Sequence, residues 1–241
     1  MERIILIETS TALCSTALAE DGAITSYRES SAPKAHASLT AVFIEEMLEE
    51  RGLTLADCDA ICVSMGPGSY TGLRVGVSTA KGLCFGSGKP LIAAGTLDTL
   101  VAQAAMEIPG QSDNGRDIAD LAKDLKYIVP MIDARRMEVY SAVFTPDGKQ
   151  LTETAPAIID ENSFAQELAQ GPVLFIGDGA GKCADVIRHP DAIFIQCHPK
   201  ASAMLSPALM AYKEKRFEDV AYFEPFYLKE FVATVSKKKL F

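Results

Sequence analysis

Tryptophan is absent from this 241-residue chain, and histidine occurs only at positions 36, 189 and 198. His36, His189 and His198 are too far apart in sequence to form the helical pair that binds many metal ions. No apolar run approaches the roughly 20 residues that span a membrane. The N-terminal run, Ile4–Ile7, is also too short for a signal peptide. We therefore expect no metal site, no membrane segment and a cytoplasmic location.

Paired cysteines and a surplus of basic residues are also missing. The six cysteines are scattered, mostly in apolar segments, and no Cys-x-x-Cys occurs; they are Cys14, Cys58, Cys62, Cys84, Cys183 and Cys197. This pattern predicts buried free thiols rather than a metal site. The net charge of −9 argues against this chain alone holding a nucleic acid. The one basic cluster, Lys237-Lys238-Lys239, is interpreted as a solvated tail whose role stays open.

The most informative segment is a glycine-rich turn at residues 66–76. It follows an apolar run at residues 60–65 that is typical of a buried strand, and it precedes a predicted helix. Its candidate residues are Gly66, Pro67, Gly68, Ser69, Tyr70, Thr71, Gly72 and Arg74. Ser69 and Thr71 are candidate helix caps. Such a turn either cradles an anion at the helix N-terminus or only shapes the chain. It matches neither the common phosphate-loop patterns nor Gly-x-Ser-x-Gly.

The two halves of the chain are organised alike. Strands are predicted at 3–8, 13–19 and 23–29, a helix at 38–51, then the strand before the glycine turn, a helix to about residue 85, a strand at 90–94 and a helix at 96–105. The second half predicts strands at 127–132 and 136–144, an extended stretch at 149–159, a helix at 161–169, a strand at 173–176 and a glycine turn that opens another helix.

Matching landmarks support a duplication. Glu8 and Asp133 each end a first strand, and Asp21-Gly22 and Asp147-Gly148 each make the following turn. The pattern predicts a duplicated α/β fold with a cleft between two lobes. We expect an N-terminal lobe at 1–106, a linker at 107–126, with a short helix late in it as an option, and a C-terminal lobe at 127–241. The last part, a C-terminal helix and tail, could pack back on the N-terminal lobe.

Three motifs, in this order, resemble the TsaB (YeaZ) family: Ile-Leu-Ile-Glu-Thr-Ser at residues 5–10, Gly-Pro-Gly-Ser-Tyr-Thr-Gly-Leu-Arg at 66–74 and Asp-Ala-Arg-Arg-Met-Glu-Val-Tyr at 133–140. Shorter matches are Lys81-Gly82-Leu83, Gly177-Asp178-Gly179-Ala180 and Pro225-Phe226-Tyr227-Leu228. The resemblance implies a two-lobed actin/Hsp70/sugar-kinase (ASKHA) fold. It also implies a part in forming N6-threonylcarbamoyladenosine at position 37 of tRNAs that read codons starting with A.

The same resemblance implies a non-catalytic subunit. The family pairs with a catalytic paralogue, TsaD, as a heterodimer, and a small ATPase, TsaE, associates with the pair. We expect no cofactor of its own, tRNA contact only within the complex, and a homodimer as an option when the chain is alone. Many relatives have Asp where this chain has Glu8. The predicted linker is also unlike that of typical relatives.

The expected nucleotide cleft is interpreted as degenerate. Its candidate residues are Glu8, Thr9, Ser10, Asp133, Arg135, Gly177 and Gly179. No general base for a phosphoryl acceptor is evident among them. The alternatives are an ATP-dependent kinase or ATPase of the same fold and, with less support, a glycoprotease-like peptidase.

Two apolar stripes are candidates for the contact with the partner. The first contains Leu39, Val42, Phe43 and Met47, and the second contains Leu73, Val77, Ala80 and Cys84. Either stripe could instead face the sheet of its own lobe. The second helix is apolar almost all round, so we predict a four-helix contact between these two helices and their counterparts on the paralogue.

Overall fold

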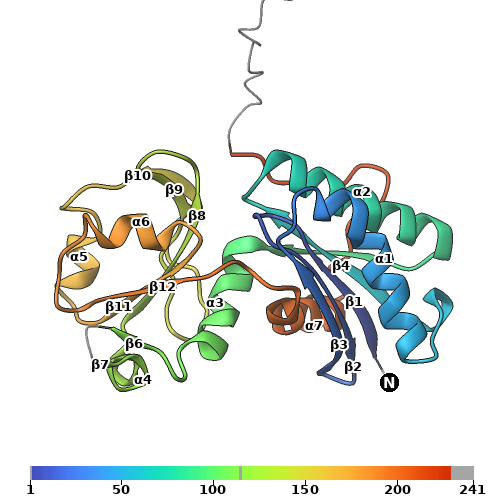
Figure 1. The fold of residues 1–241 in the computed structure, drawn as a ribbon, viewed down its shortest axis with the longest axis horizontal. Helices are drawn as coiled ribbons and strands as arrows, with labels where there is room; N and C mark the ends of the chain where they lie inside the picture. The colour runs from blue at the N-terminus through green and yellow to red at the C-terminus, as the bar shows by residue number, and fades with distance from the viewer. Residues whose placement is uncertain (1, 114–115, 229–241) are drawn as a thin grey trace, which may run out of the picture.

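The fold consists of two five-stranded sheets with the same strand order, in a computed structural model that describes residues 2–113 and 116–228 (Figure 1). The orders are β3-β2-β1-β4-β5 and β10-β9-β8-β11-β12. In each sheet the first three strands are antiparallel neighbours and the last three run parallel. The repeated order confirms the predicted duplication and the two-lobed fold of the actin/Hsp70/sugar-kinase type.

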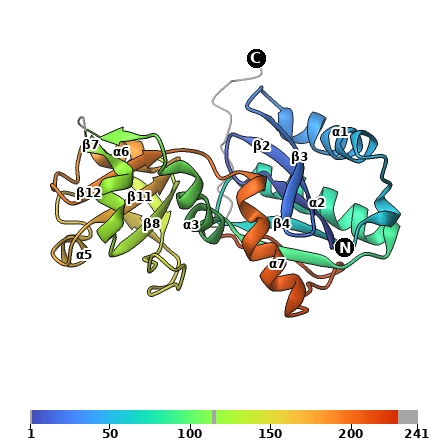
Figure 2. The same cartoon turned by 90° about the horizontal axis from the view of Figure 1, so that it is seen from below.

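The N-terminal sheet is covered on both faces by helices. Its strands are β1 (Arg3–Glu8), β2 (Cys14–Glu20), β3 (Ala23–Ser30), β4 (Ala60–Gly66) and β5 (Leu91–Gly95). Helices α1 (Ala35–Glu50) and α2 (Tyr70–Ser87) cover one face. A short 3₁₀ turn, η3 (Ala201–Met204), and α7 (Leu205–Lys213) cover the other (Figure 2). The central strand β1 has four apolar residues in a row because both of its faces are buried.

The C-terminal sheet is covered in the same way. Its strands are β8 (Tyr127–Asp133), β9 (Glu138–Ser141), β10 (Ala155–Ile158), β11 (Val173–Gly177) and β12 (Ala192–Gln196). Helices α5 (Ala165–Leu168) and α6 (Ala180–Ala184) pack on one face, and α3 (Thr96–Glu107) packs on the other. The predicted helix at 161–169 is therefore a single short turn, and the predicted strand at 136–144 is shorter than expected.

The two halves exchange a helix. α3 follows the N-terminal strands, yet Leu97, Leu100 and Val101 belong to the core of the C-terminal sheet. α7 follows the C-terminal strands, yet Met204 and Ala208 close the core beneath β1 and β5. The covalent boundary predicted at residue 106 therefore does not divide the two cores, because long-range packing assigns these helices across it.

The segment 107–126 has structure of its own. It contains β6 (Ser112–Asp113), β7 (Arg116–Asp117), α4 (Ile118–Leu121) and the 3₁₀ turn η2 (Ala122–Asp124). Ile118 is 1% exposed and packs in the core of the C-terminal sheet, so the segment of the predicted linker, with its short late helix, contributes to that core. The Lys237–Lys239 tail lies outside the described residues.

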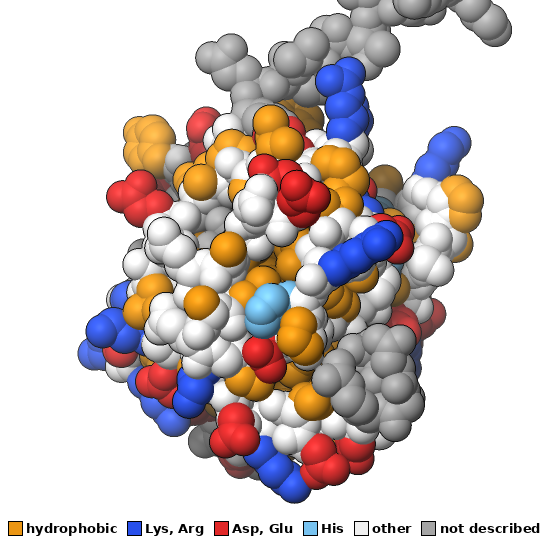
Figure 3. Space-filling model, turned by 90° about the vertical axis from the view of Figure 1, so that its left-hand side faces the viewer, with side chains coloured by type: hydrophobic (Ala, Val, Ile, Leu, Met, Phe, Trp, Pro, Cys, Tyr) orange, Lys and Arg blue, Asp and Glu red, His pale blue; other side chains and the backbone are white. Residues whose placement is uncertain are grey.

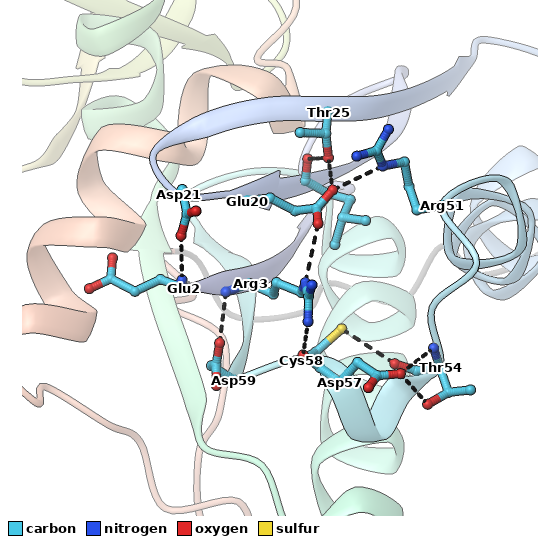
Figure 4. A network of polar contacts seen from close by, with 11 residues as sticks. Glu2, Arg3, Glu20, Asp21, Thr25, Arg51, Thr54, Asp57, Cys58 and Asp59 are labelled. Carbon is cyan, nitrogen blue, oxygen red and sulfur yellow. Dashed lines mark hydrogen bonds and ion pairs between the residues drawn. The ribbon is translucent and has the colours of Figure 1, made fainter.

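Polar contacts fix the end of the N-terminal sheet where β1 begins (Figure 4). Arg3 donates through Nε to Glu20 at 3.1 Å, and the second oxygen of Glu20 accepts from Arg51 at 3.0 Å and from Thr25 at 2.8 Å. The network joins β1, β2, β3 and the residue after α1.

None of the helices in the described parts of the chain is long and apolar enough to cross a membrane.

Candidate functional site

The glycine turn closes directly over the residues that follow β1. The backbone N–H of Ser69 donates to the carbonyl oxygen of Ser10 at 2.6 Å. The Ser69 hydroxyl accepts from the Gly72 N–H at 3.3 Å, so Ser69 is the N-cap of α2. At least one N–H group that could face an anion thus already has a partner within the chain.

Three glycines make this closure possible. A Cβ at Gly68 would lie 2.3 Å from the Ser10 carbonyl oxygen, and one at Gly72 would lie 2.1 Å from the Thr9 carbonyl oxygen. A Cβ at Gly76 would lie 2.2 Å from the Thr9 hydroxyl. Real Cβ atoms do not approach so closely, so each position requires glycine for the packing of α2 against segment 8–11. The glycine pattern therefore has a structural cause inside this chain.

Glu8 is completely buried beneath this turn. Its Oε1 accepts from the Ser10 N–H at 2.6 Å, whereas its Oε2 has no hydrogen-bond partner among the residues that the structure describes. Burial raises the pKa of Glu8 to about 7, against hydrogen bonds from Ser10, Ser64 and Thr9 that lower it. The hydroxyls of Thr9, Ser10 and Thr11 are also buried, and no partner for them lies in the described part of the chain. Near neutral pH, a substantial fraction of Glu8 is thus an uncharged acid, unlike a carboxylate that binds a metal or a nucleotide complex.

The C-terminal lobe repeats this site with a different charge pattern. Lys182 on α6 donates to Asp133 and, at 2.8 Å and 2.7 Å, to the carbonyl oxygens of Arg136 and Glu138. Burial alone would raise the pKa of Asp133, but the bonds from Lys182 and the Arg135 N–H lower it overall. Asp133 is thus an ionised carboxylate neutralised by a lysine from its own lobe.

The turn that follows β11 packs against the end of β8. In the N-terminal lobe, the glycine turn at 66–76 packs in the same way against the residues that follow β1. The Asp178 carboxylate accepts from the Asp133 N–H at 2.9 Å, and the pKa of Asp178 is raised by burial. A Cβ at Gly177 would lie 2.3 Å from the Met131 carbonyl oxygen, and Gly179 lies against the same strand. Arg135 is exposed and has a positive φ of 72° in the adjacent turn. The candidate cleft residues therefore form two separate closed turns, one in each lobe.

The three histidines lie at separate places. His36 bonds the Thr11 carbonyl oxygen at 2.9 Å, His189 lies 3.8 Å from Asp191, and His198 lies 3.9 Å from Asp178. Within residues 2–113 and 116–228, no group of three His, Cys, Asp or Glu side chains could hold a metal ion. Five of the cysteines are buried, and Cys197 is half-buried. Burial raises the pKa of Cys58, Cys84 and Cys183 to about 11, so these thiols are unreactive near neutral pH.

The second predicted partner stripe is wrong. Leu73, Val77, Ala80 and Cys84 are at most 4% exposed, and the last three pack against β1 and β4 together with Met47 of the first stripe. Apolar side chains of this helix that point to the sheet are already covered, so they are unavailable to a partner. A charged residue at position 77 or 80 would disrupt the core rather than report on pairing.

Other side chains of the same two helices face outward. Val42 is 41% exposed and Phe85 is 88% exposed, while Leu39, Phe43 and Val75 are half-buried. Phe85 carries the largest exposed apolar surface on α2, and the sequence pattern missed it because small residues surround it. The one sequence feature that could have indicated Phe85 is that it is an aromatic residue outside the apolar stripe of α2.

Charged side chains of both signs are interspersed on the outer face of the C-terminal lobe (Figure 3). Binding to nucleic-acid phosphates requires Lys and Arg to be grouped along one surface. The mixed charges on this face, together with the net charge of −9, give no such surface there.

Comparison with known proteins decides the family. The family model described as TsaD, tRNA N6-adenosine threonylcarbamoyltransferase, matches residues 29–235. The chain belongs to this family. Among its relatives, the TsaB protein of Escherichia coli K12, a tRNA threonylcarbamoyladenosine biosynthesis protein, is 29% identical over 96% of each chain. The TsaB protein of Haemophilus influenzae is 39% identical over 57% of this chain and 51% of its own.

Solved structures of YeaZ proteins resemble this chain over nearly its whole length. YeaZ from Pseudomonas aeruginosa superimposes with a TM-score of 0.77 at 25% identity, covering 95% of this chain and 100% of that one. Among the sequence relatives, a tRNA N6-adenosine threonylcarbamoyltransferase from Jannaschia sp. is 48% identical, but the match covers only 25% of this chain and 17% of that protein. The full-length match to TsaB and the partial match to the transferase confirm the resemblance seen in the sequence.

Proposed function

We propose that this TsaB-family chain takes part in the biosynthesis of threonylcarbamoyladenosine in tRNA, as a non-catalytic subunit that stabilises a catalytic TsaD-like paralogue. The observation that carries this function is the match to a named TsaB protein over 96% of each chain. The modified base is adenosine 37 of tRNAs that read codons starting with A. The proposed location is the cytoplasm, where tRNA is modified.

The non-catalytic role is supported by how the two glycine turns are used. Ser69 donates its N–H to Ser10, and Lys182 neutralises Asp133. Glu8 is buried, with its pKa raised to about 7. A phosphoryl-transfer site needs free N–H groups and ionised carboxylates that can hold a nucleotide with its metal ion. In this chain those groups already serve the fold.

The outward faces of α1 and α2 are the proposed contact with the paralogue. They present Leu39, Val42, Phe43, Val75 and Phe85. Exposed apolar side chains gathered on two adjacent helices are typical of a protein–protein contact. A TsaE-like ATPase would join the assembled pair, and tRNA would bind only to the assembly, since the chain alone is acidic.

The test is to deplete the chain in its own host and to measure threonylcarbamoyladenosine in total tRNA by mass spectrometry. We expect the modification to fall and wild-type protein to restore it. In parallel, an affinity pull-down should recover a larger paralogue in near one-to-one amounts. A normal modification level together with ATP hydrolysis by the isolated chain would instead favour the kinase or ATPase alternative.

A variant in the turn of the C-terminal lobe sharpens the experiment. Lys182→Met removes the charge that neutralises Asp133 and should lower stability without abolishing tRNA modification if the chain is non-catalytic. Millimolar Mg-ATP should leave the melting temperature of the isolated chain unchanged, because only ligands that bind the folded state raise it. A shift of several degrees would contradict the closed-turn argument.

A further inference from the structure

The C-terminal segment at residues 217–228, called the strap here, runs along α2 in the opposite direction to the helix. Lys81 Nζ donates to the carbonyl oxygens of Ala221 and Phe223, both at 3.1 Å. Further along the strap, the ring of Tyr227 lies 4.8 Å from the ring of Tyr70 at the start of α2. The strap therefore covers one flank of α2, and α1 covers the other.

The strap is fixed to the N-terminal lobe at both ends. The Glu218 N–H donates to the Leu91 carbonyl oxygen at 2.9 Å, and the Phe226 N–H donates to the Met65 carbonyl oxygen at 2.7 Å. Between them, the Phe223 side chain is 9% exposed and belongs to the core beneath α1 and α2. Side chains that point outward from the strap are thus carried on a backbone that is already ordered.

Tyr222 is 84% exposed on this ordered backbone. Lys81 binds the carbonyls on either side of Tyr222, and Phe85, which is 88% exposed, lies one helical turn beyond Lys81. Two large aromatic side chains are therefore presented on adjacent elements. Aromatic anchors on a fixed backbone lose little conformational entropy on binding, which makes them effective contact residues.

We infer that the strap is the third element of the pairing surface, and that Tyr222 is buried against the TsaD-like paralogue beside Phe85. This inference rests on the proposed function. The transferase family model matches residues 29–235, which include α1, α2 and the strap. The paralogue thus carries equivalent elements, and two related folds can bring equivalent faces together about a pseudo-two-fold axis.

The charged residues around this surface indicate which charges the paralogue should carry at the edge of the contact. The outward side of α1 carries Glu45 and Glu49 next to Val42, and the strap carries exposed Glu218 and Glu224. An acidic rim around an apolar centre pairs with a basic rim. The paralogue should therefore supply Lys or Arg at the edge of this contact, and association should slow as salt concentration rises.

The test measures the dissociation constant of the purified full-length chain for the paralogue from the same host. Tyr222→Ser and Phe85→Ser should each raise it by roughly 10- to 30-fold, as expected for aromatic anchors. Phe217→Ser is the matched control. Phe217 is 42% exposed at the start of the strap, but its ring packs 6.0 Å from Tyr212 of α7, so its substitution should change the constant less than about threefold.

The outcomes separate the two proposals. A large effect of Phe85→Ser with none of Tyr222→Ser would remove the strap from the surface and leave the proposed function intact. Failure of the wild-type chain to bind the paralogue would overturn both. If Tyr222→Ser instead dissolves a homodimer and leaves paralogue binding unchanged, the occupant is a second copy and the inference is wrong. Circular dichroism should show unchanged folding, because the Tyr222 side chain makes no part of the core.

Discussion

Replacing Glu8 with glutamine should change how the stability of this protein depends on pH. The Glu8 carboxyl is completely buried, and its pKa is raised from 4.5 to about 7. The folded protein therefore binds the Glu8 proton more tightly than the unfolded chain does. This stabilising contribution is fully present below pH 4.5 and is lost as the pH rises through about 7. A difference of this size corresponds to about 3 kcal/mol in the free energy of unfolding.

Glu8→Gln keeps the size of the side chain and the oxygen that accepts from Ser10, but it has no proton to lose. Urea unfolding at pH values from 5 to 8 should show wild type losing about 2–3 kcal/mol relative to the variant, so that Glu8→Gln is the more stable protein at pH 8. Asp133→Asn is the control, because the pKa of Asp133 is lowered and its neutral analogue should gain no stability at pH 8.

Parallel curves for wild type and Glu8→Gln across this range would refute the reasoning. They would mean that Glu8 is ionised in the folded protein and has a stabilising partner. A variant that is less stable than wild type at pH 8 would lead to the same conclusion.

Two further predictions test the packing around α2 and between the lobes. Gly72→Ala should lower the free energy of unfolding by about 1–3 kcal/mol, because its Cβ would lie 2.1 Å from the Thr9 carbonyl oxygen. Gly82→Ala on the same helix would place its Cβ more than 4 Å from every other described side chain or strand, so it should raise stability by up to about 1 kcal/mol in thermal melts. Gln103→Met should lower the free energy of unfolding by about 2–4 kcal/mol, and it should speed hydrogen exchange at the backbone amide of Lys200. The reason is that the fully buried Gln103 side-chain amide donates to the His198 carbonyl oxygen and accepts from the Lys200 N–H, both at 2.9 Å. The control is Gln166→Met at an exposed site, which should change neither the stability nor the exchange rate.

The order of elements followed from the sequence because each depends on local pattern. Four consecutive apolar residues in β1 predicted a strand buried on both faces, and Gly66, Gly68 and Gly72 predicted a sharp turn before a helix. Glu8 and Asp133 marked equivalent positions in the two halves, which is why the duplication was visible without any contact information. The sequence also predicted that the turn either binds an anion or only shapes the chain, and it could not choose between these.

The choice between those readings required atomic contacts. The Ser69 N–H is used by Ser10, a residue far away in sequence, and the environment of Glu8 depends on burial beneath α2. A carboxyl group has the same residue type whether its pKa is ordinary or raised, so the sequence carries no direct signal of its protonation.

By itself, the sequence determined the family, the duplicated α/β fold and the positions of the two glycine turns, because strand periodicity, turn chemistry and motif order are local properties. The tertiary structure alone decided that Leu73, Val77, Ala80 and Cys84 face inward, that α3 and α7 each cover the other half's sheet, and that the strap lies along α2. An apolar stripe shows that a helix face is covered, but only long-range packing decides whether the cover is its own sheet, a distant part of the same chain or another protein.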